Sequence, residues 1–148
     1  FNYRLDEIQA AMLNIKLPHL EAWTELRRCA AARYDSHLSA AGLQTPAPPN
    51  GRNHVYHVYA VRVREREAIR AALAPHVGTG IHYPIPIHLQ PAYADLGYRR
   101  GDFPVSESLA NELLSLPMFP GLTDDQVDTV CDRLCEAVGA APVAGRAA

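Results

Sequence analysis

The stretch "HVYHVYAVRV", residues 54–63, predicts a β-strand, and the fold class expected for this sequence depends on it. Valine and tyrosine are favoured in strands, because branched and aromatic side chains pack well on a pleated surface. Both faces of the stretch are semi-apolar, which predicts a strand inside a sheet and not at its edge. His54 and His57 are three residues apart, so in a strand they point to opposite faces and cannot share a metal ion.

Helical patterns precede this strand. Apolar residues at helical spacing predict one helix over 4–16 and a second from about 19 to 40, and Pro18 breaks the first. One face of the second predicted helix carries Leu20, Trp23, Arg27, Ala30, Tyr34 and Leu38.

Further helices and strands alternate after residue 63. The expected elements are a helix at 65–77, a strand from Gly78, a helix at 105–114, a strand at 114–119 and a helix from 123 to about 138. The last helix opens on "TDDQ", a capping box in which Thr123 and Gln126 each satisfy an amide, worth about 1 kcal/mol. Three strands among so many helices predict an α+β fold with a small three-stranded sheet.

The composition narrows the class of protein. The chain has 148 residues and a formal charge of −2 without a basic run, which argues against nucleic acid or an anionic membrane as partner. No apolar run approaches the 18 residues of a membrane span. Cys131 and Cys135 are predicted to be buried thiols, with a metal or redox pair as the alternative. Reduced thiols fit a cytoplasmic protein.

The stretch "GTGIHYPIPIHLQPAY", residues 78–93, is too rich in proline to be a regular element. It is either a stiff edge of the fold or a strip that presents His82, Tyr83, His88 and Tyr93 to a ligand. The two histidines are six residues apart with no Asp or Glu between them, so a zinc site is not expected. Ordinary hydrogen-bonded histidines are the default interpretation.

Asn2 stands at the entrance of the first predicted helix, with Arg4 one turn in. Helix N-termini favour anions, because their amides point outward and the helix dipole is positive there. Asn2 is therefore either a plain N-cap or part of a phosphate site, and Arg4 is either solvated or part of the same site.

Four stretches together resemble one known family. They are "NYRLDEIQAAML" at 2–13, residues 54–63, "GIHYPIPIHLQPAY" at 80–93 and "LGYRRGDFPVSESLANELLSLPMFPGLTDDQV" at 96–127. In this order and spacing they resemble the C-terminal part of the DegT/StrS-type aminotransferases. The resemblance implies a fold-type-I enzyme that uses pyridoxal 5'-phosphate. It also implies a homodimer with shared active sites.

The resemblance further implies a reaction and a division of the chain. Such enzymes convert a keto nucleotide-sugar to an amino sugar with glutamate or glutamine as amino donor, in polysaccharide or antibiotic biosynthesis. Residues 1–17 would end the large cofactor-binding domain, and residues 18–138 would form the C-terminal small domain. Residues 139–148 are expected to be a disordered tail.

The resemblance also assigns site residues. Asn2 matches the asparagine that reaches across the dimer towards the cofactor phosphate, and Arg4 belongs to the same motif. His82 and Tyr83 become candidate contacts to the sugar or diphosphate of the substrate, and His88 a weaker candidate.

The lysine that carries the family's chemistry has no counterpart here. Lys16 is the single lysine and falls where the family has a structural position. No catalytic residue is therefore expected in this stretch, and the chain by itself is expected to be an inactive fragment of a longer enzyme, since it begins at Phe1 and enters a helix almost at once. The alternative is a non-catalytic binding or dimerisation module derived from the family.

Overall fold

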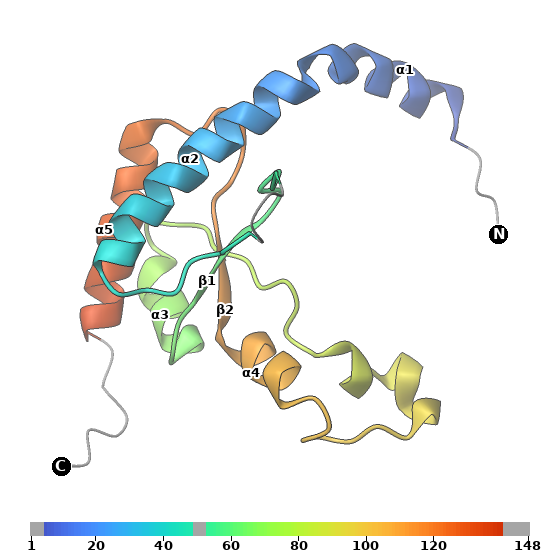
Figure 1. Cartoon of the computed structure of the whole chain (residues 1–148), viewed down its shortest axis with the longest axis vertical. Coiled ribbons are helices and arrows are strands. Elements are labelled where there is room, and N and C mark those ends of the chain that lie inside the picture. Colours follow the sequence, from blue (N-terminus) through green and yellow to red (C-terminus); the bar gives the residue numbers. More distant parts are fainter. Residues whose placement is uncertain (1–4, 49–52, 141–148) are drawn as a thin grey trace.

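The computed structural model describes residues 5–48 and 53–140. Within these residues the elements are α1 (Glu7–Lys16), α2 (Leu20–Ala40), β1 (Tyr59–Arg62), α3 (Arg66–Leu73), α4 (Pro104–Glu112), β2 (Leu113–Leu116) and α5 (Asp124–Ala140). Short 3₁₀ turns lie at Leu17–His19, Ile87–Leu89 and Pro91–Leu96. The α+β class is confirmed (Figure 1). None of these helices is both long enough and apolar enough to cross a membrane.

The sheet has two antiparallel strands where the sequence predicted three. β1 pairs with β2 from Tyr59 opposite Leu116 to Arg62 opposite Leu113. The strand expected from Gly78 is wrong, because it is reduced to a single bridge between Gly80 and Ser115. Pro84 and Pro86 follow closely and have no amide hydrogen to donate to a strand ladder.

The first strand is shorter than the pattern predicted. Tyr56 has a φ of 45°, which interrupts the extended backbone, and β1 begins only at Tyr59. His54 and His57 therefore lie in the loop before β1, where the amide of Tyr56 donates to Nδ1 of His54 at 2.9 Å. The loop is attached to α2 by Arg28, whose Nε donates to the carbonyl of His54 at 3.0 Å.

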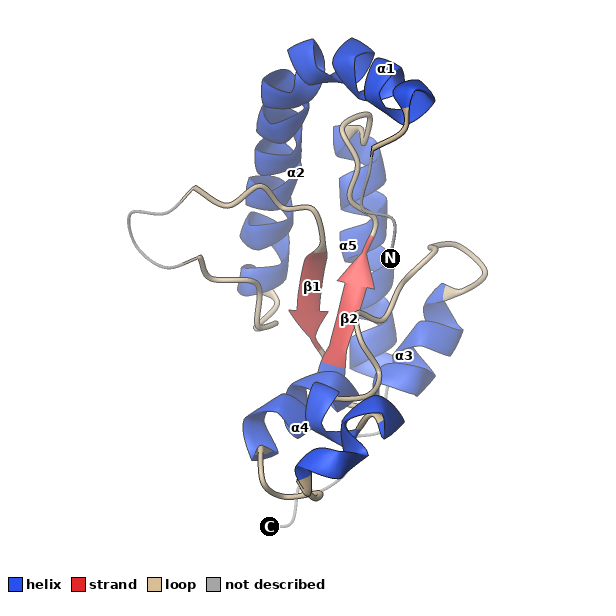
Figure 2. Ribbon diagram, turned by 90° about the vertical axis from the view of Figure 1, so that its right-hand side faces the viewer, coloured by secondary structure: helices blue, strands red, loops and turns tan. Residues whose placement is uncertain are grey.

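The core lies where α2, α3 and α5 cover the sheet. Figure 2 shows α2 and α5 side by side behind the strands, and these two helices contact one another. The largest fully buried side chains are Tyr34, Leu38, Tyr59, Val61, Leu73, Leu114, Val127, Cys131 and Leu134. The predicted face of α2 is buried only in its second half, since Leu20 is exposed and Ala30, Tyr34 and Leu38 are buried.

The ends of two helices test the capping predictions. The capping box at the start of α5 is confirmed. The backbone N–H of Gln126 donates to Oγ1 of Thr123 at 3.3 Å, and the backbone N–H of Thr123 donates to Oε1 of Gln126 at 3.0 Å. Asn2 lies outside the described residues, so its interpretation as an N-cap stays a prediction. Asp6 caps α1 by accepting the amide of Gln9 at 2.9 Å, because the helix starts three residues later than expected.

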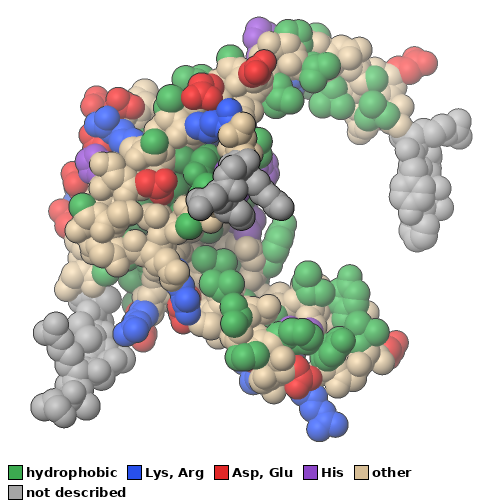
Figure 3. All heavy atoms as spheres, in the orientation of Figure 1, with side chains coloured by type: hydrophobic (Ala, Val, Ile, Leu, Met, Phe, Trp, Pro, Cys, Tyr) green, Lys and Arg blue, Asp and Glu red, His purple; other side chains and the backbone are tan. Residues whose placement is uncertain are grey.

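Two parts of the chain project from the core on the same side. One is α1, which continues α2 after a bend at Leu17–His19, and the other is residues 81–103, hereafter the arm. Figure 3 shows a hollow between them, with hydrophobic side chains on both sides of it. No residue of α1 is buried, and Ile8 is 76% exposed.

Candidate substrate-binding site

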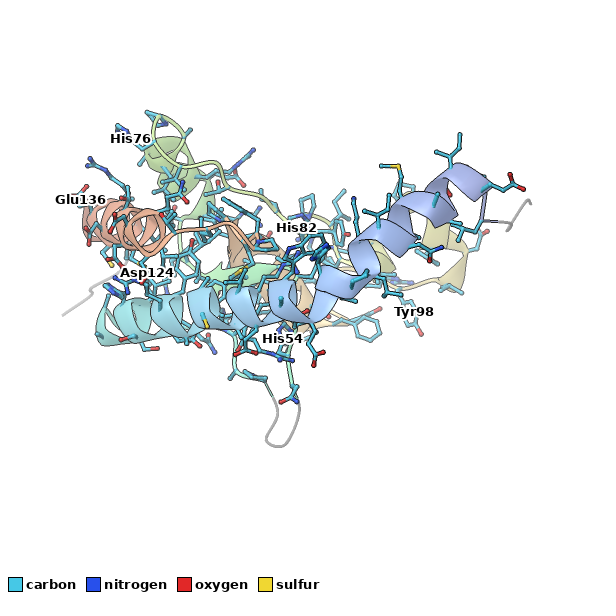
Figure 4. All side chains as sticks on the ribbon, turned by 90° about the horizontal axis from the view of Figure 1, so that it is seen from above. His54, His76, His82, Tyr98, Asp124 and Glu136 are labelled. Carbon is cyan, nitrogen blue, oxygen red and sulfur yellow. The ribbon has the colours of Figure 1, made fainter. Side chains whose placement is uncertain are left out.

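A pocket of about 530 Å³ lies between the arm and α4. Its lining is His82, Tyr83, Ile85, Pro86, Ile87, His88, Gln90, Tyr93, Leu96, Tyr98, Phe103, Ser106, Leu109, Ala110 and Leu113. All three residues predicted to contact the substrate, His82, Tyr83 and His88, are therefore brought to one pocket. Figure 4 labels His82 near the sheet and Tyr98 farther out in the arm.

His82 is held at the edge of the sheet. Its Nδ1 lies 2.9 Å from Oγ of Ser115 on β2, and its ring lies over Gly80. A Cβ atom on Gly80 would lie only 2.9 Å from Cε1 of the ring, so the absence of a side chain there gives the ring its place. Nε2 of His82 has no hydrogen-bond partner among residues 5–48 and 53–140, which leaves this atom for a ligand.

Tyr83 follows His82 and is 73% exposed. Its ring meets the ring of His82 nearly edge-on, with centroids 5.6 Å apart. The pair presents one imidazole nitrogen and one phenol to the pocket, and both can hydrogen-bond to a sugar or phosphate oxygen.

His88 is held by the protein itself. Its side chain is 8% exposed, and Nε2 lies 3.1 Å from Oε1 of Glu107 on α4. The His88 ring packs against Phe103 with centroids 4.8 Å apart. The hydrogen bond from the Gly101 amide, at 2.7 Å, and the one from His88 lower the pKa of the Glu107 carboxyl. His88 therefore fastens the arm to α4, and its contact with a substrate stays a prediction.

The pocket contains no charged group that could neutralise a phosphate. None of its lining residues is Lys or Arg. Two arginines close in sequence to β1 are engaged elsewhere, since Arg62 pairs with Glu112 and Arg66 donates to the carbonyl of Ala110. The pocket can thus hold an apolar or ring-shaped part of a ligand and supply hydrogen bonds.

The described residues do not form a pyridoxal phosphate site. Lys16 lies exposed at the end of α1, and Asn2 and Arg4 fall outside the described residues. Burial raises the pKa of the Cys131 thiol to about 12, so this sulfur is not a nucleophile at neutral pH. Cys131 is buried as predicted, and Cys135 is half-buried. Over residues 5–48 and 53–140 no cluster of three metal-ligating side chains occurs.

Three residues of the site were not predicted. Ser115 contacts His82 from 33 residues away in the sequence and Glu107 contacts His88 from 19 residues away, while Gly80 makes room for the His82 ring from two residues away. No local motif marks such contacts. A serine in an apolar strand, "LLSL" at 113–116, was the one available signal, because a buried hydroxyl needs a partner.

The fold is a small α+β domain with a largely apolar pocket between the arm and α4. The chain belongs to the DegT/DnrJ/EryC1/StrS aminotransferase family, whose sequence pattern matches residues 1–135. This match confirms the resemblance found in the sequence.

Individual relatives agree with the family. The chain is 45% identical over 140 residues to the "pleiotropic regulatory protein" of Geobacillus stearothermophilus, covering 92% of this chain and 38% of that protein. It is 42% identical over 128 residues to the UDP-N-acetyl-3-dehydro-α-D-glucosamine 3-aminotransferase of Acidithiobacillus ferrooxidans, covering 86% and 34%.

A solved structure shows the same fold. The structure of Streptomyces venezuelae DesV in complex with a ketimine intermediate superposes with a TM-score of 0.85 at 41% identity, covering 90% of this chain and 36% of that one. The chain therefore spans between 34% and 38% of the length of these three relatives.

Proposed function

We propose that this chain is the C-terminal part of a pyridoxal-phosphate-dependent aminotransferase that converts a keto nucleotide-sugar to an amino sugar, with glutamate or glutamine as donor. The observation that carries the proposal is the family match over residues 1–135, which includes both α1 and the arm that bears the pocket. Relatives with related activities, such as the aminotransferase of A. ferrooxidans, support the class of substrate.

In this proposal residues 1–17 complete a large domain and residues 18–138 form the small domain. The exposed apolar side of α1 supports this division. An amphipathic helix normally buries its apolar stripe, yet Ile8, Met12 and Ile15 are all exposed here. We infer that the rest of the large domain covers this stripe in the complete polypeptide.

The cofactor would be held by the remainder of the polypeptide, with help from Asn2 and Arg4 of the other copy in a homodimer. When bound, it supplies an electron sink for the transfer of an amino group. The role of this chain is to bind and orient: His82 and Tyr83 donate hydrogen bonds to the sugar or diphosphate, and the apolar pocket excludes water beside them. The cations for the diphosphate would come from elsewhere, because the pocket has none.

The test measures the mass of the native polypeptide, the lysine that forms the cofactor adduct and the formation of an amino sugar. The native polypeptide should be far heavier than the 16.3 kDa of this chain, and borohydride reduction should fix a pyridoxyl label on a lysine outside it. The 148-residue chain alone should form no amino sugar. A stable label on Lys16, or product formed by the chain alone, would contradict the proposal.

A second candidate is a non-catalytic binding or dimerisation module, favoured by the lack of lysine and arginine among the residues that line the pocket. The same experiment separates the two. A native mass near 16.3 kDa together with binding to a full-length relative would support the module.

A further inference from the structure

Ser115 is a buried polar residue, with 5% of its surface exposed. It lies on β2, between Leu114 and Leu116, and faces the bridge to Gly80. Two backbone hydrogen bonds make this bridge: the Gly80 amide donates to the Ser115 carbonyl at 2.9 Å, and the Ser115 amide donates to the Gly80 carbonyl at 2.8 Å. The hydroxyl is thus fixed on the edge of the sheet that faces His82.

The hydroxyl has one partner in the described residues, Nδ1 of His82 at 2.9 Å. A hydroxyl carries one proton to donate and two lone pairs to accept with. If the ring donated from Nδ1, the Ser115 proton would be left buried without an acceptor, which is unfavourable. The favourable arrangement is therefore Ser115 donating to Nδ1, with the ring proton on Nε2.

Gly80 leaves room for the ring in this arrangement. Its backbone is not in the left-handed region, so an alanine there is not strained by φ. The Cβ of an alanine would, however, lie 2.9 Å from Cε1 of His82 and displace the ring from Ser115. Two residues from different segments thus determine where the imidazole lies and which nitrogen carries its proton.

We propose that Ser115 is a positioning residue that holds His82 as the neutral Nε2–H tautomer, so that His82 donates a hydrogen bond to an oxygen of the ligand in the pocket. The identification of that ligand as a nucleotide sugar rests on the proposed function. The tautomer itself does not, because it follows from contacts within this chain.

The direct test is the tautomer in the unliganded chain. Long-range ¹H–¹⁵N correlation of the imidazole rings, recorded at about pH 8.5, well above the ordinary histidine pKa near 6.5, reports which nitrogen carries the proton. Loss of one set of signals in His82→Gln identifies His82 among the seven histidines. We expect the proton on Nε2. A proton on Nδ1 would overturn the proposal.

Two variants perturb the contact in different ways. Ser115→Ala removes the hydroxyl. Gly80→Ala displaces the His82 ring but leaves the Ser115 hydroxyl in place. In both, the difference between the two ring nitrogen shifts of His82 should narrow as the ring is released, while amide signals of β1 and β2 show that the sheet persists. Ser39→Ala, an exposed serine on α2, is the matched control and should leave the signals unchanged. Unmoved His82 signals in both variants would overturn the proposal, and the unliganded native chain gives an answer even if a variant fails to fold.

The complete enzyme provides the functional readout. Ser115→Ala should raise KM for the nucleotide sugar about three- to tenfold with little change in kcat, since it weakens one hydrogen bond in binding. In a His82→Ala background the same substitution should add nothing, because Ser115 acts through His82. An equal loss in both backgrounds would overturn the proposal. If no aminotransferase activity exists at all, the proposed function fails while the measured tautomer still decides the role of Ser115.

Discussion

At the scale of single residues, the polar atoms of buried side chains form hydrogen bonds, and Tyr59 on β1 is an example. The residue is fully buried, and its hydroxyl donates to Oδ1 of Asp35 at 2.5 Å. Its ring stacks on Tyr34 with centroids 4.8 Å apart, and the Tyr34 hydroxyl donates to the carbonyl of Pro117 at 3.1 Å. Burial, and then the bond to Asp35, raise the pKa of Tyr59, so the phenol stays neutral and remains a donor.

At this scale we predict that Tyr59→Phe lowers the free energy of unfolding by about 1.5–3 kcal/mol, the range for a hydrogen bond to a charged group. Urea denaturation at neutral pH measures this change in the free energy of unfolding. Tyr93→Phe is the control, because Tyr93 is 44% exposed and should change stability by less than about 0.5 kcal/mol. Equal effects of the two substitutions would show that the Asp35 contact contributes nothing.

Pairs of elements are joined by charge as well as by apolar packing. Arg33 on α2 makes two hydrogen bonds to Asp128 on α5, from Nε at 2.6 Å and from the terminal nitrogen at 2.5 Å. Asp124 accepts a further bond from Arg33 at 3.1 Å, and His37 lies 3.3 Å from Asp128. The bond from Arg33 lowers the pKa of the Asp128 carboxyl. This bidentate geometry makes the contact stronger than an ordinary surface pair.

At the scale of the helix pair we predict that Asp128→Asn lowers the free energy of unfolding at pH 7. Because the carboxyl has a lower pKa folded than unfolded, its stabilisation is complete above the ordinary aspartate pKa near 3.9 and is lost as the pH falls through the folded value. Urea denaturation of both proteins from about pH 7 to pH 2 should show the difference vanish in acid.

The control for this helix pair is Glu136→Gln, which removes an exposed pair with Arg133 within α5 and should cost less than about 0.5 kcal/mol. A difference between Asp128→Asn and the parent that persisted unchanged at pH 2 would contradict the electrostatic explanation.

Across the whole molecule, stability is uneven. The sheet and the helices behind it hold the buried side chains, whereas α1 holds none and the arm is largely exposed. An element without buried side chains opens at little cost in free energy. In the longer enzyme proposed above, we expect surfaces outside this chain to cover α1 and the arm.

At this largest scale we predict that Ile8→Glu changes the stability of the 148-residue chain by less than about 0.5 kcal/mol, because Ile8 is 76% exposed. In the complete polypeptide the same change should cost roughly 1.5–3 kcal/mol, since a covered isoleucine loses its burial. Thermal unfolding of the two proteins compares them. An equally small effect in both would mean that nothing covers this side of α1. Leu38→Ala, at a fully buried position, should cost roughly 2–5 kcal/mol in either protein.

Predictions from sequence were best where the physical cause is local. The helical periodicity over 19–40 and 105–114 and the capping box at Thr123 depend on neighbours a few residues apart, and each was found. The strand from Gly78 was predicted wrongly because its extended pattern is local, whereas ladder formation needs donors that Pro84 and Pro86 lack. The sequence also led us to expect His82 and Tyr83 at a ligand, and both line the pocket.

The sequence by itself determined the α+β class, the positions of the helices and, through its motifs, the family. Only the tertiary structure decided that the sheet has two strands, that Glu107 holds His88 and that Ser115 holds His82. The physical reason is the distance along the sequence over which each interaction acts. Periodicity and capping act over one or two helical turns, while the proton on an imidazole depends on a hydroxyl that the fold brings within 2.9 Å from 33 residues away.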